Sequence, residues 1–192
     1  MKHSRHAARI LALALAGLFL AWCPPAHALD RPSISATRAT GPLRVDGALD
    51  EPSWGTAAPI SDFLLMSPRE AQAPDESTVV KVLYDDERIV FGIWCGSKRP
   101  LRASLTPRDQ ILDGDHISLH LDTDGDGQRA YIFGVNPYGV ELDGILTGDP
   151  DFKWDAVWDA AARREPGAWT AEIAVPFRTM RFRPGANRPW RL

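Results

Sequence analysis

Apolar and polar positions alternate with a period of two along much of the chain after residue 77. In HISLHLD (116–122), Ile117, Leu119 and Leu121 would point to one face of a strand, and the two histidines to the other. Such alternation is typical of a β-strand with one buried and one solvated face. Further strand candidates lie at 78–84, 89–95, 130–135, 140–142, 154–161, 169–175 and 190–192.

Turn-forming residues separate these candidates. Residues 85–88 (DDER) would join the first two as a hairpin, and residues 136–139 (NPYG) form another turn signal. Residues 53–58 suit only a short helical turn, and no stretch beyond residue 28 has the periodicity of a long helix. We therefore predict an all-β fold, a two-sheet antiparallel β-sandwich of the jelly-roll-like type.

The first 28 residues have the three parts of a secretory signal peptide. Three basic residues come first, an uncharged apolar run follows from Ile10 to Trp22, and Ala26-His27-Ala28 matches a cleavage site. The apolar run is shorter than the about 20 residues that span a bilayer as a helix. We predict a signal peptide at 1–28, cleaved before Leu29, and export to the periplasm, the outer membrane or the extracellular space.

Without this signal, the chain is acidic and has one cysteine. Residues 1–28 hold three Lys or Arg and no acid, which leaves 19 basic and 25 acidic residues and a net charge of −6. Lys and Arg are not clustered as nucleic-acid binding requires, so no nucleic-acid partner is expected. Cys95 has no second cysteine to pair with, so the fold depends on its core. We predict an N-terminal linker at 29–42 and one domain at 43–192.

An Asp/Gly-rich stretch, DTDGDG, follows the strand candidate at 116–122. Asp122, Asp124 and Asp126 occupy positions one, three and five of a loop, as carboxylate ligands of Ca²⁺ do, and Gly127 permits a sharp turn. An EF-hand would need a glutamate at position twelve, where this chain has Phe133. Two interpretations stay open, a structural Ca²⁺ site and a plain hairpin turn.

Trp154 and Trp158 would lie on one face of an extended segment, about 13 Å apart. At that spacing they could contact alternate units of a glycan chain, so both are candidate carbohydrate-binding residues. The alternative is that they belong to the core, since large aromatic side chains dominate cores. For Trp54, Trp94 and Trp169, the surrounding alternation predicts a position in the core.

Acidic residues are numerous enough to raise a hydrolase as an alternative. A glycosidase needs two carboxyl groups about 5 to 10 Å apart, and no sequence pattern selects such a pair. No nucleophile elbow, zinc-binding helix or phosphate loop occurs in the sequence, so no catalytic residue is predicted. The candidate acids are Asp46, Asp50, Glu51, Asp109, Asp115, Asp143 and Glu172.

Five phrases together resemble the family-nine carbohydrate-binding modules, and are most similar to the N-terminal β-sandwich of some uncharacterised bacterial outer-membrane proteins. The phrases are LRVDGALDEPSW (43–54), TVVKVLYDDERIVFGIW (78–94), RDQILDGDHISLHLDTDGDGQRAYIFGVNPYGVELDG (108–144), WDAVW (154–158) and WTAEIAVPFRTMRF (169–182). The resemblance implies a non-catalytic sandwich that binds sugars or lies beside a domain that does. It also implies calcium at loops and aromatic stacking on sugar rings.

The chain departs from these modules at two places. Residues 111–113 (Ile-Leu-Asp) include no aromatic where the modules have a stacking tryptophan, and a second stacking tryptophan lies in a C-terminal region that this chain does not reach. The sequence ends at Leu192 where a closing strand would begin, so a fragment of a longer product is an open alternative.

We therefore expect an exported, non-catalytic carbohydrate-binding module that serves carbohydrate catabolism and is attached to a larger glycan-active or outer-membrane protein. Its expected partner is a polysaccharide or oligosaccharide. One alternative is a periplasmic structural or interaction domain that precedes an outer-membrane β-barrel. The other is a small hydrolase of O-glycosyl bonds.

Overall fold

The structure is a computed structural model that describes residues 33–68, 70–110, 113–183 and 189–192. The predicted signal peptide, residues 1–28, lies outside the described residues. The chain divides into Met1–Ser33, of which only Ser33 is described, and the compact unit Ile34–Leu192. The elements of this unit are β1 (Thr37–Arg38), η1 (Pro52–Gly55), β2 (Thr78–Tyr84), β3 (Arg88–Gly96), β4 (Ile117–Leu121), β5 (Ala130–Val135), β6 (Glu141–Thr147), β7 (Asp149–Asp151), β8 (Asp159–Glu165), β9 (Ala168–Pro176) and η2 (Phe177–Thr179).

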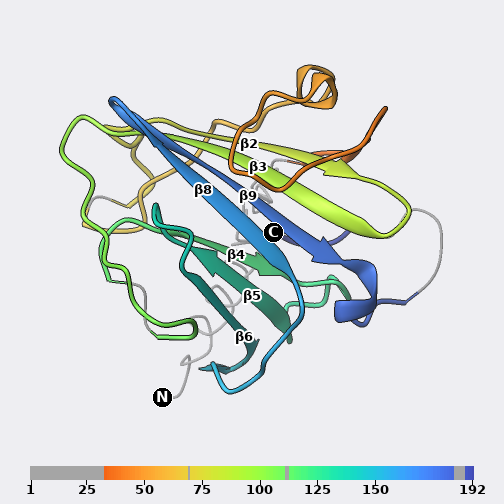
Figure 1. The fold of residues 1–192 in the computed structure, drawn as a ribbon. Helices are drawn as coiled ribbons and strands as arrows, with labels where there is room; N and C mark the ends of the chain where they lie inside the picture. The colour runs from red at the N-terminus through yellow and green to blue at the C-terminus, as the bar shows by residue number, and fades with distance from the viewer. Residues whose placement is uncertain (1–32, 69, 111–112, 184–188) are drawn as a thin grey trace, which may run out of the picture. The chain divides into compact units, whose positions relative to one another are not determined.

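The strands of the described chain form two sheets, which pack as two layers (Figure 1). The larger sheet has the order β1-β2-β3-β9-β8, and the smaller has the order β4-β5-β6-β7. Neighbouring strands are antiparallel, except that the two-residue β1 runs parallel to β2. The predicted all-β, two-sheet sandwich is confirmed, and no α-helix occurs in the part of the chain that the structure describes. β1 comes from the segment predicted as a linker.

The main core lies between the inner faces of the two sheets. From the larger sheet, Phe91, Ile93 and Ile173 are at most 2% exposed, and from the smaller sheet Phe133 and Val135 are fully buried. These residues occupy alternate positions of their strands, so the period-two pattern of the sequence is also the pattern of burial. Removal of this apolar surface from water is the main force that holds the two layers together.

The opposite face of the larger sheet carries a second apolar cluster, covered by the segment 39–57. Leu83 and Val90 are fully buried there against Trp54, which the short helix η1 presents to the sheet. A Cβ atom at Gly92 would lie 2.7 Å from the Trp54 ring. The absence of a side chain at this position therefore lets the indole rest directly on β3.

Several predicted strands are confirmed, whereas one is displaced. The candidates at 78–84 and 130–135 coincide with β2 and β5. The strand predicted at 154–161 begins only at Asp159, although the residues before it alternate in burial and Trp158 among them is buried. The alternation in this segment reflects its packing on the core, because the segment has no strand partner in the sheets.

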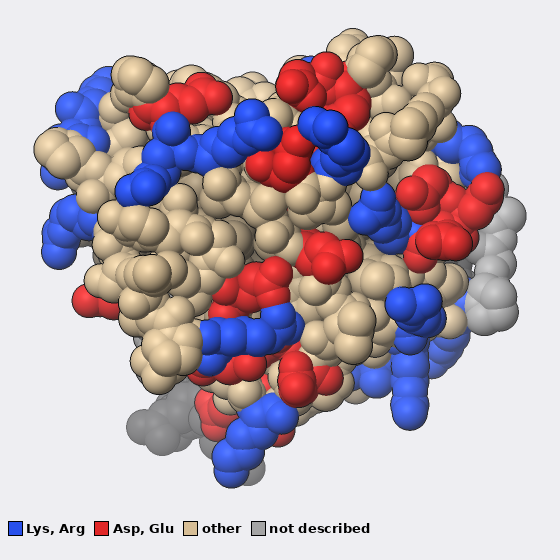
Figure 2. All heavy atoms as spheres, viewed as in Figure 1, with Lys and Arg blue, Asp and Glu red and all other residues tan. Residues whose placement is uncertain are grey.

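Acidic and basic side chains are interspersed on the face of the molecule shown in Figure 2, and neither sign forms a continuous patch there. On this face, no basic stripe of the kind that follows a phosphate backbone is present. Within the described residues, no helix has the length and apolar character that would be needed to cross a membrane.

Candidate functional site

The Asp-rich turn joins β4 to β5, and its first aspartate organises the loop. Oδ1 of Asp122 accepts the backbone N–H groups of Asp124 at 3.1 Å and Gly125 at 2.7 Å, and Oδ2 accepts that of Gly127 at 2.7 Å. Burial by itself would raise the pKa of Asp122, but these three backbone donors hold the pKa below its usual value. Asp122 therefore caps the turn.

The other two aspartates of the turn also face hydrogen-bond donors. Oδ2 of Asp124 accepts Nη2 of Arg129 at 3.0 Å, and its Oδ1 lies 3.6 Å from Nε of Arg183. Oδ1 of Asp126 accepts the backbone N–H of Gln128 at 2.9 Å. Calcium requires six to eight oxygen ligands, and the oxygens of Asp122 and Asp124 are engaged by N–H groups and guanidinium groups. The turn does not fit a calcium cage in this conformation, and calcium binding there stays a prediction.

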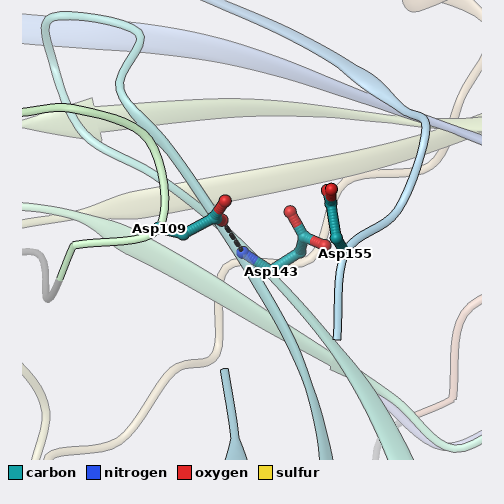
Figure 3. A group of neighbouring side chains, drawn as sticks. All are labelled: Asp109, Asp143 and Asp155. Carbon is teal, nitrogen blue, oxygen red and sulfur yellow. Dashed lines mark hydrogen bonds between the residues drawn. The ribbon is translucent and has the colours of Figure 1, made fainter. Parts of the chain in front are cut away.

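A different set of carboxylates converges in the structure, namely Asp109, Asp143 and Asp155 (Figure 3). They come from the loop before β4, from β6 and from the segment before β8, and one oxygen of each lies within 4.8 Å of the others. Asp143 is fully buried, whereas Asp155 is exposed. Because the three residues belong to separate elements, no local spacing in the sequence indicates this cluster.

Arg108 and neighbouring N–H groups compensate the charge of this cluster. Nη2 of Arg108 donates to Oδ1 of Asp143 at 2.6 Å, Nε1 of Trp158 donates to the same oxygen at 3.1 Å, and the backbone N–H of Ala156 donates to Oδ2 at 2.8 Å. Burial raises the pKa of Asp143, against the opposing effects of Trp158 and Arg108. Arg108 also pairs with Glu141. The network therefore bridges β6 and the segment before β8.

The structure separates the two tryptophans that the sequence suggests for glycan binding. Trp158 is only 4% exposed, and its ring lies edge-on to Phe133 with the ring centroids 5.2 Å apart. Its indole belongs to the main core and presents no open face. Trp154 is partly buried, packs against Tyr131 at a centroid distance of 5.3 Å, and lines a pocket. Of the two, Trp154 is therefore the accessible candidate.

The three other tryptophans discussed above differ in their burial. Trp54 and Trp169 are buried, as predicted, but the prediction for Trp94 is wrong. Trp94 lies on the outer face of the larger sheet and is 36% exposed, because its neighbours Ile93 and Cys95 take the inward positions. Residues 89–95 of β3 carry no charged side chain and are apolar on both faces, so the sequence does not distinguish the two faces.

A pocket opens where β5 and β6 of the smaller sheet meet the chain that follows β9. Its volume of about 360 Å³ is within the usual range of small-molecule sites. Apart from Trp154, none of the described lining residues was predicted from the sequence. The described lining residues are Arg129, Tyr131, Ile145, Trp154, Thr179 and Arg181.

Long-range contacts hold the wall of this pocket. The backbone N–H of Arg181 donates to the hydroxyl of Tyr131 at 2.9 Å, and the hydroxyl of Thr179 donates to the carbonyl of Val157 at 2.8 Å. The guanidinium carbon of Arg129 lies 5.5 Å from the centre of the Tyr131 ring. These residues meet only because the strand register and the return of the chain after β9 bring them together, so a local motif could not have identified them.

A second pocket, of about 270 Å³, lies beside Arg108. Its aromatic residue is Tyr138, but the guanidinium carbon of Arg164 lies 4.2 Å from the centre of that ring and covers one face. The pocket beside Trp154 therefore offers the better combination of aromatic surface and open volume. The described lining residues of the second pocket are Leu105, Thr106, Arg108, Tyr138, Gly139, Val140 and Glu141.

A comparison with protein families finds a match over most of the chain. The family model described as "Carbohydrate family 9 binding domain-like" matches residues 45–188, which include the elements from η1 to η2. No curated protein matches the sequence.

The solved structures that resemble the fold include the following three. The first is a carbohydrate binding module family 9 from Caldicellulosiruptor kristjanssonii in complex with cellotriose, with a TM-score of 0.51 and 15% identity over 73% of this chain and 66% of that one. The second is a module of the same family and organism in complex with glucose, with a TM-score of 0.53 and 14% identity over 74% and 69%. The third is a carbohydrate-binding candidate from Bacteroides uniformis, with a TM-score of 0.59 and 12% identity over 76% and 73%. At these identities the likeness shows the fold alone, and this chain spans just under two thirds of the first structure.

Proposed function

The chain belongs to the carbohydrate family 9 binding domain-like family, and from this premise we propose that it is a non-catalytic module that binds a polysaccharide or oligosaccharide. Family membership supports the class of ligand. The solved structures with the same fold include modules in complex with cellotriose and with glucose. Neither comparison identifies the residues of this chain that would contact a sugar.

The binding site in this proposal is the pocket that contains Trp154. The observation that carries it is the partly buried indole of Trp154 in a pocket of about 360 Å³ whose described lining includes Arg129 and Arg181. Aromatic rings supply apolar contact area at low entropic cost, and a few polar groups fix the orientation of a ligand. The pocket combines both kinds of group in the way that recognition of a sugar requires.

Substitution of Trp154 by alanine tests the site. We expect the Kd for cellotriose or glucose to rise by at least about tenfold, as for an aromatic hot spot of binding, in titration calorimetry. Trp94→Ala is the matched control, because Trp94 is the exposed tryptophan on the other sheet. Circular dichroism melts of both variants separate loss of binding from loss of folding. Unchanged affinity in a folded Trp154→Ala variant would reject the site.

In the cell, the proposed module acts outside the cytoplasm in carbohydrate catabolism, as part of a larger glycan-active or outer-membrane protein. The pattern of residues 1–28 supports export. Mass spectrometry of the exported product is expected to find an N-terminus at Leu29. An immunoblot of cell fractions with an antibody against residues 43–192 measures the size and location of the native polypeptide. A cytoplasmic polypeptide of 192 residues that retains Met1 would contradict both the proposed export and the proposed attachment to a larger protein.

A further inference from the structure

The two charged side chains among the described lining residues of the Trp154 pocket, Arg129 and Arg181, are both basic. We infer that this pocket selects an anionic sugar unit, such as a uronic acid, whose carboxylate contacts the arginines while the sugar ring contacts Trp154. The inference rests on the proposed function and specifies the ligand class of the same site.

Arg181 has a fixed backbone and an available side chain. Its backbone N–H donates to the hydroxyl of Tyr131 at 2.9 Å, and its carbonyl accepts the hydroxyl of Thr123 at 2.6 Å. The side chain is exposed, and within the residues that the structure describes no carboxylate pairs with its guanidinium. A ligand carboxylate would therefore meet this cation without first displacing an acidic partner.

Arg129 is held in place and retains donors for a ligand. Its Nη2 donates to Oδ2 of Asp124 at 3.0 Å, and among the described residues no acceptor engages its Nε or Nη1. Asp124 also faces Arg183, whose Nε lies 3.6 Å from Oδ1. Asp124 is thus shared by two cations and is outside the described lining. Arg129, Arg181 and Arg183 therefore outnumber Asp124.

The chemistry of the guanidinium group determines which ligand benefits. Its planar fork matches a carboxylate with two parallel N–H···O bonds, and charge-assisted bonds of this kind are about twice as strong as neutral ones. A neutral hydroxymethyl group at the same position of the sugar ring offers only ordinary hydrogen bonds. A sulfate ester would present the same anionic chemistry, so the shared property of the expected ligands is an anionic substituent on the ring.

Titration calorimetry with glucose, glucuronic acid and glucose 6-sulfate at neutral pH tests the inference, because the three sugars differ at one carbon. We expect glucuronate to bind about tenfold more tightly than glucose or better. Added salt is expected to weaken the binding of the two anionic sugars and to leave that of glucose nearly unchanged. Tight binding of the sulfate ester together with the glucuronate would support the same anionic chemistry.

Arg181→Gln is expected to abolish the preference for the anion, so that the Kd for glucuronate rises by about tenfold or more and approaches the Kd for glucose in the same variant, since glutamine retains donors without charge. Arg178→Gln is the matched control, because Arg178 is exposed on η2 and does not line the pocket. Equal binding of glucose and glucuronate would overturn this inference and leave the proposed function standing. An anion preference that survives Arg181→Gln would overturn the assignment to this pocket. Failure of these three sugars and of cellotriose to bind would overturn both.

Discussion

At the scale of single residues, two buried carboxylates differ in the donors that reach them. Both oxygens of Asp122 accept backbone N–H groups, whereas only Oε2 of Glu172 does, from Asp46 at 2.8 Å and Gly47 at 2.9 Å. Oε1 of Glu172 has no partner, and burial raises the pKa of this carboxyl to about 7. The ionised carboxylate of Asp122 therefore stabilises the fold, whereas that of Glu172 destabilises it.

Asp122→Ala is expected to destabilise the protein by about 1–3 kcal/mol at neutral pH, because three backbone N–H groups lose their acceptor. The folded-state pKa of Asp122 is lowered, so its contribution is present above the unfolded-state pKa and is lost as the pH falls through the folded-state pKa. Denaturant unfolding at neutral and acidic pH measures this. The control is Asp126→Ala, which removes an exposed carboxylate that accepts one backbone hydrogen bond. An equal loss of stability in both variants would contradict the capping role of Asp122.

Calcium at the turn can be tested in the same series. Bound calcium would raise the melting temperature through mass action, and EGTA would reverse the rise. If the turn is the site, Asp126→Asn is expected to remove this response, whereas Asp155→Asn in the other acidic cluster keeps it. If Asp155→Asn removed the response and Asp126→Asn kept it, the calcium site would be the cluster around Asp143. A melting temperature that EGTA does not change would contradict calcium binding at either place.

Glu172→Gln is expected to change how stability depends on pH. The pKa of Glu172 is raised from 4.5 to about 7 in the folded state. Its contribution is therefore complete below the unfolded-state pKa and is lost as the pH rises through the folded-state pKa. Relative to the unmodified chain, the variant gains stability as the pH rises from 4.5 to about 7. Unfolding in urea measures the difference, with the exposed Glu165→Gln as control, and a difference that is constant over pH would contradict it.

At the scale of elements, the alternation of apolar residues locates a strand better than it orients one. β4 alternates with polar residues, and its inward positions are predictable. Residues 89–95 of β3 are apolar on both faces, and the segment 39–57 covers part of the outer face. The apolar pattern therefore does not show that Trp94 points outward. The burial of residues 154–158 alternates because this segment packs on the core. Whether the segment also pairs with another strand depends on residues that are distant in the sequence, so the local pattern cannot show it.

Gly92→Ala tests the contact between η1 and the larger sheet. The added Cβ would meet the Trp54 ring at 2.7 Å, so either the indole or β3 must move. We expect a destabilisation of about 1–3 kcal/mol, as for other overpacked sites, measured as a lower denaturation midpoint. Gly41→Ala is the control, since nothing lies within 4 Å of its added Cβ. Equal stability of the two variants would show that the segment 39–57 can shift away from β3 without loss of stability.

At the scale of the whole molecule, the sandwich was predictable from the sequence and the candidate site was not. Period-two patterns and turn residues are local, so they indicate strands, and many short strands indicate two packed sheets. The Trp154 pocket joins residues from Arg129 to Arg181 through strand register, a long-range property. The cluster of Asp109, Asp143 and Asp155 has the same origin. Of the pocket residues, only Trp154 was a sequence-based candidate, and Asp109 and Asp143 were candidate acids that no sequence pattern brought together.

Both sheets contribute to one core, so the compact unit is expected to unfold in a single cooperative transition. Trp158 and Trp169 report on the interior through their fluorescence, and far-ultraviolet circular dichroism reports on the strands. The two thermal unfolding curves are expected to superimpose. Separate midpoints would mean that the sheets lose their structure independently, in disagreement with a shared core.

Two outer strands of the sheets have a consequence for the behaviour of concentrated solutions. β7 is three exposed residues long with Pro150 at its centre, and β8 ends in Arg163, Arg164 and Glu165. A proline lacks the N–H that a further strand would need, and flanking charges repel a like partner. These two margins are therefore protected against edge-to-edge association into fibrils, and concentrated solutions of the protein are not expected to form aggregates through them.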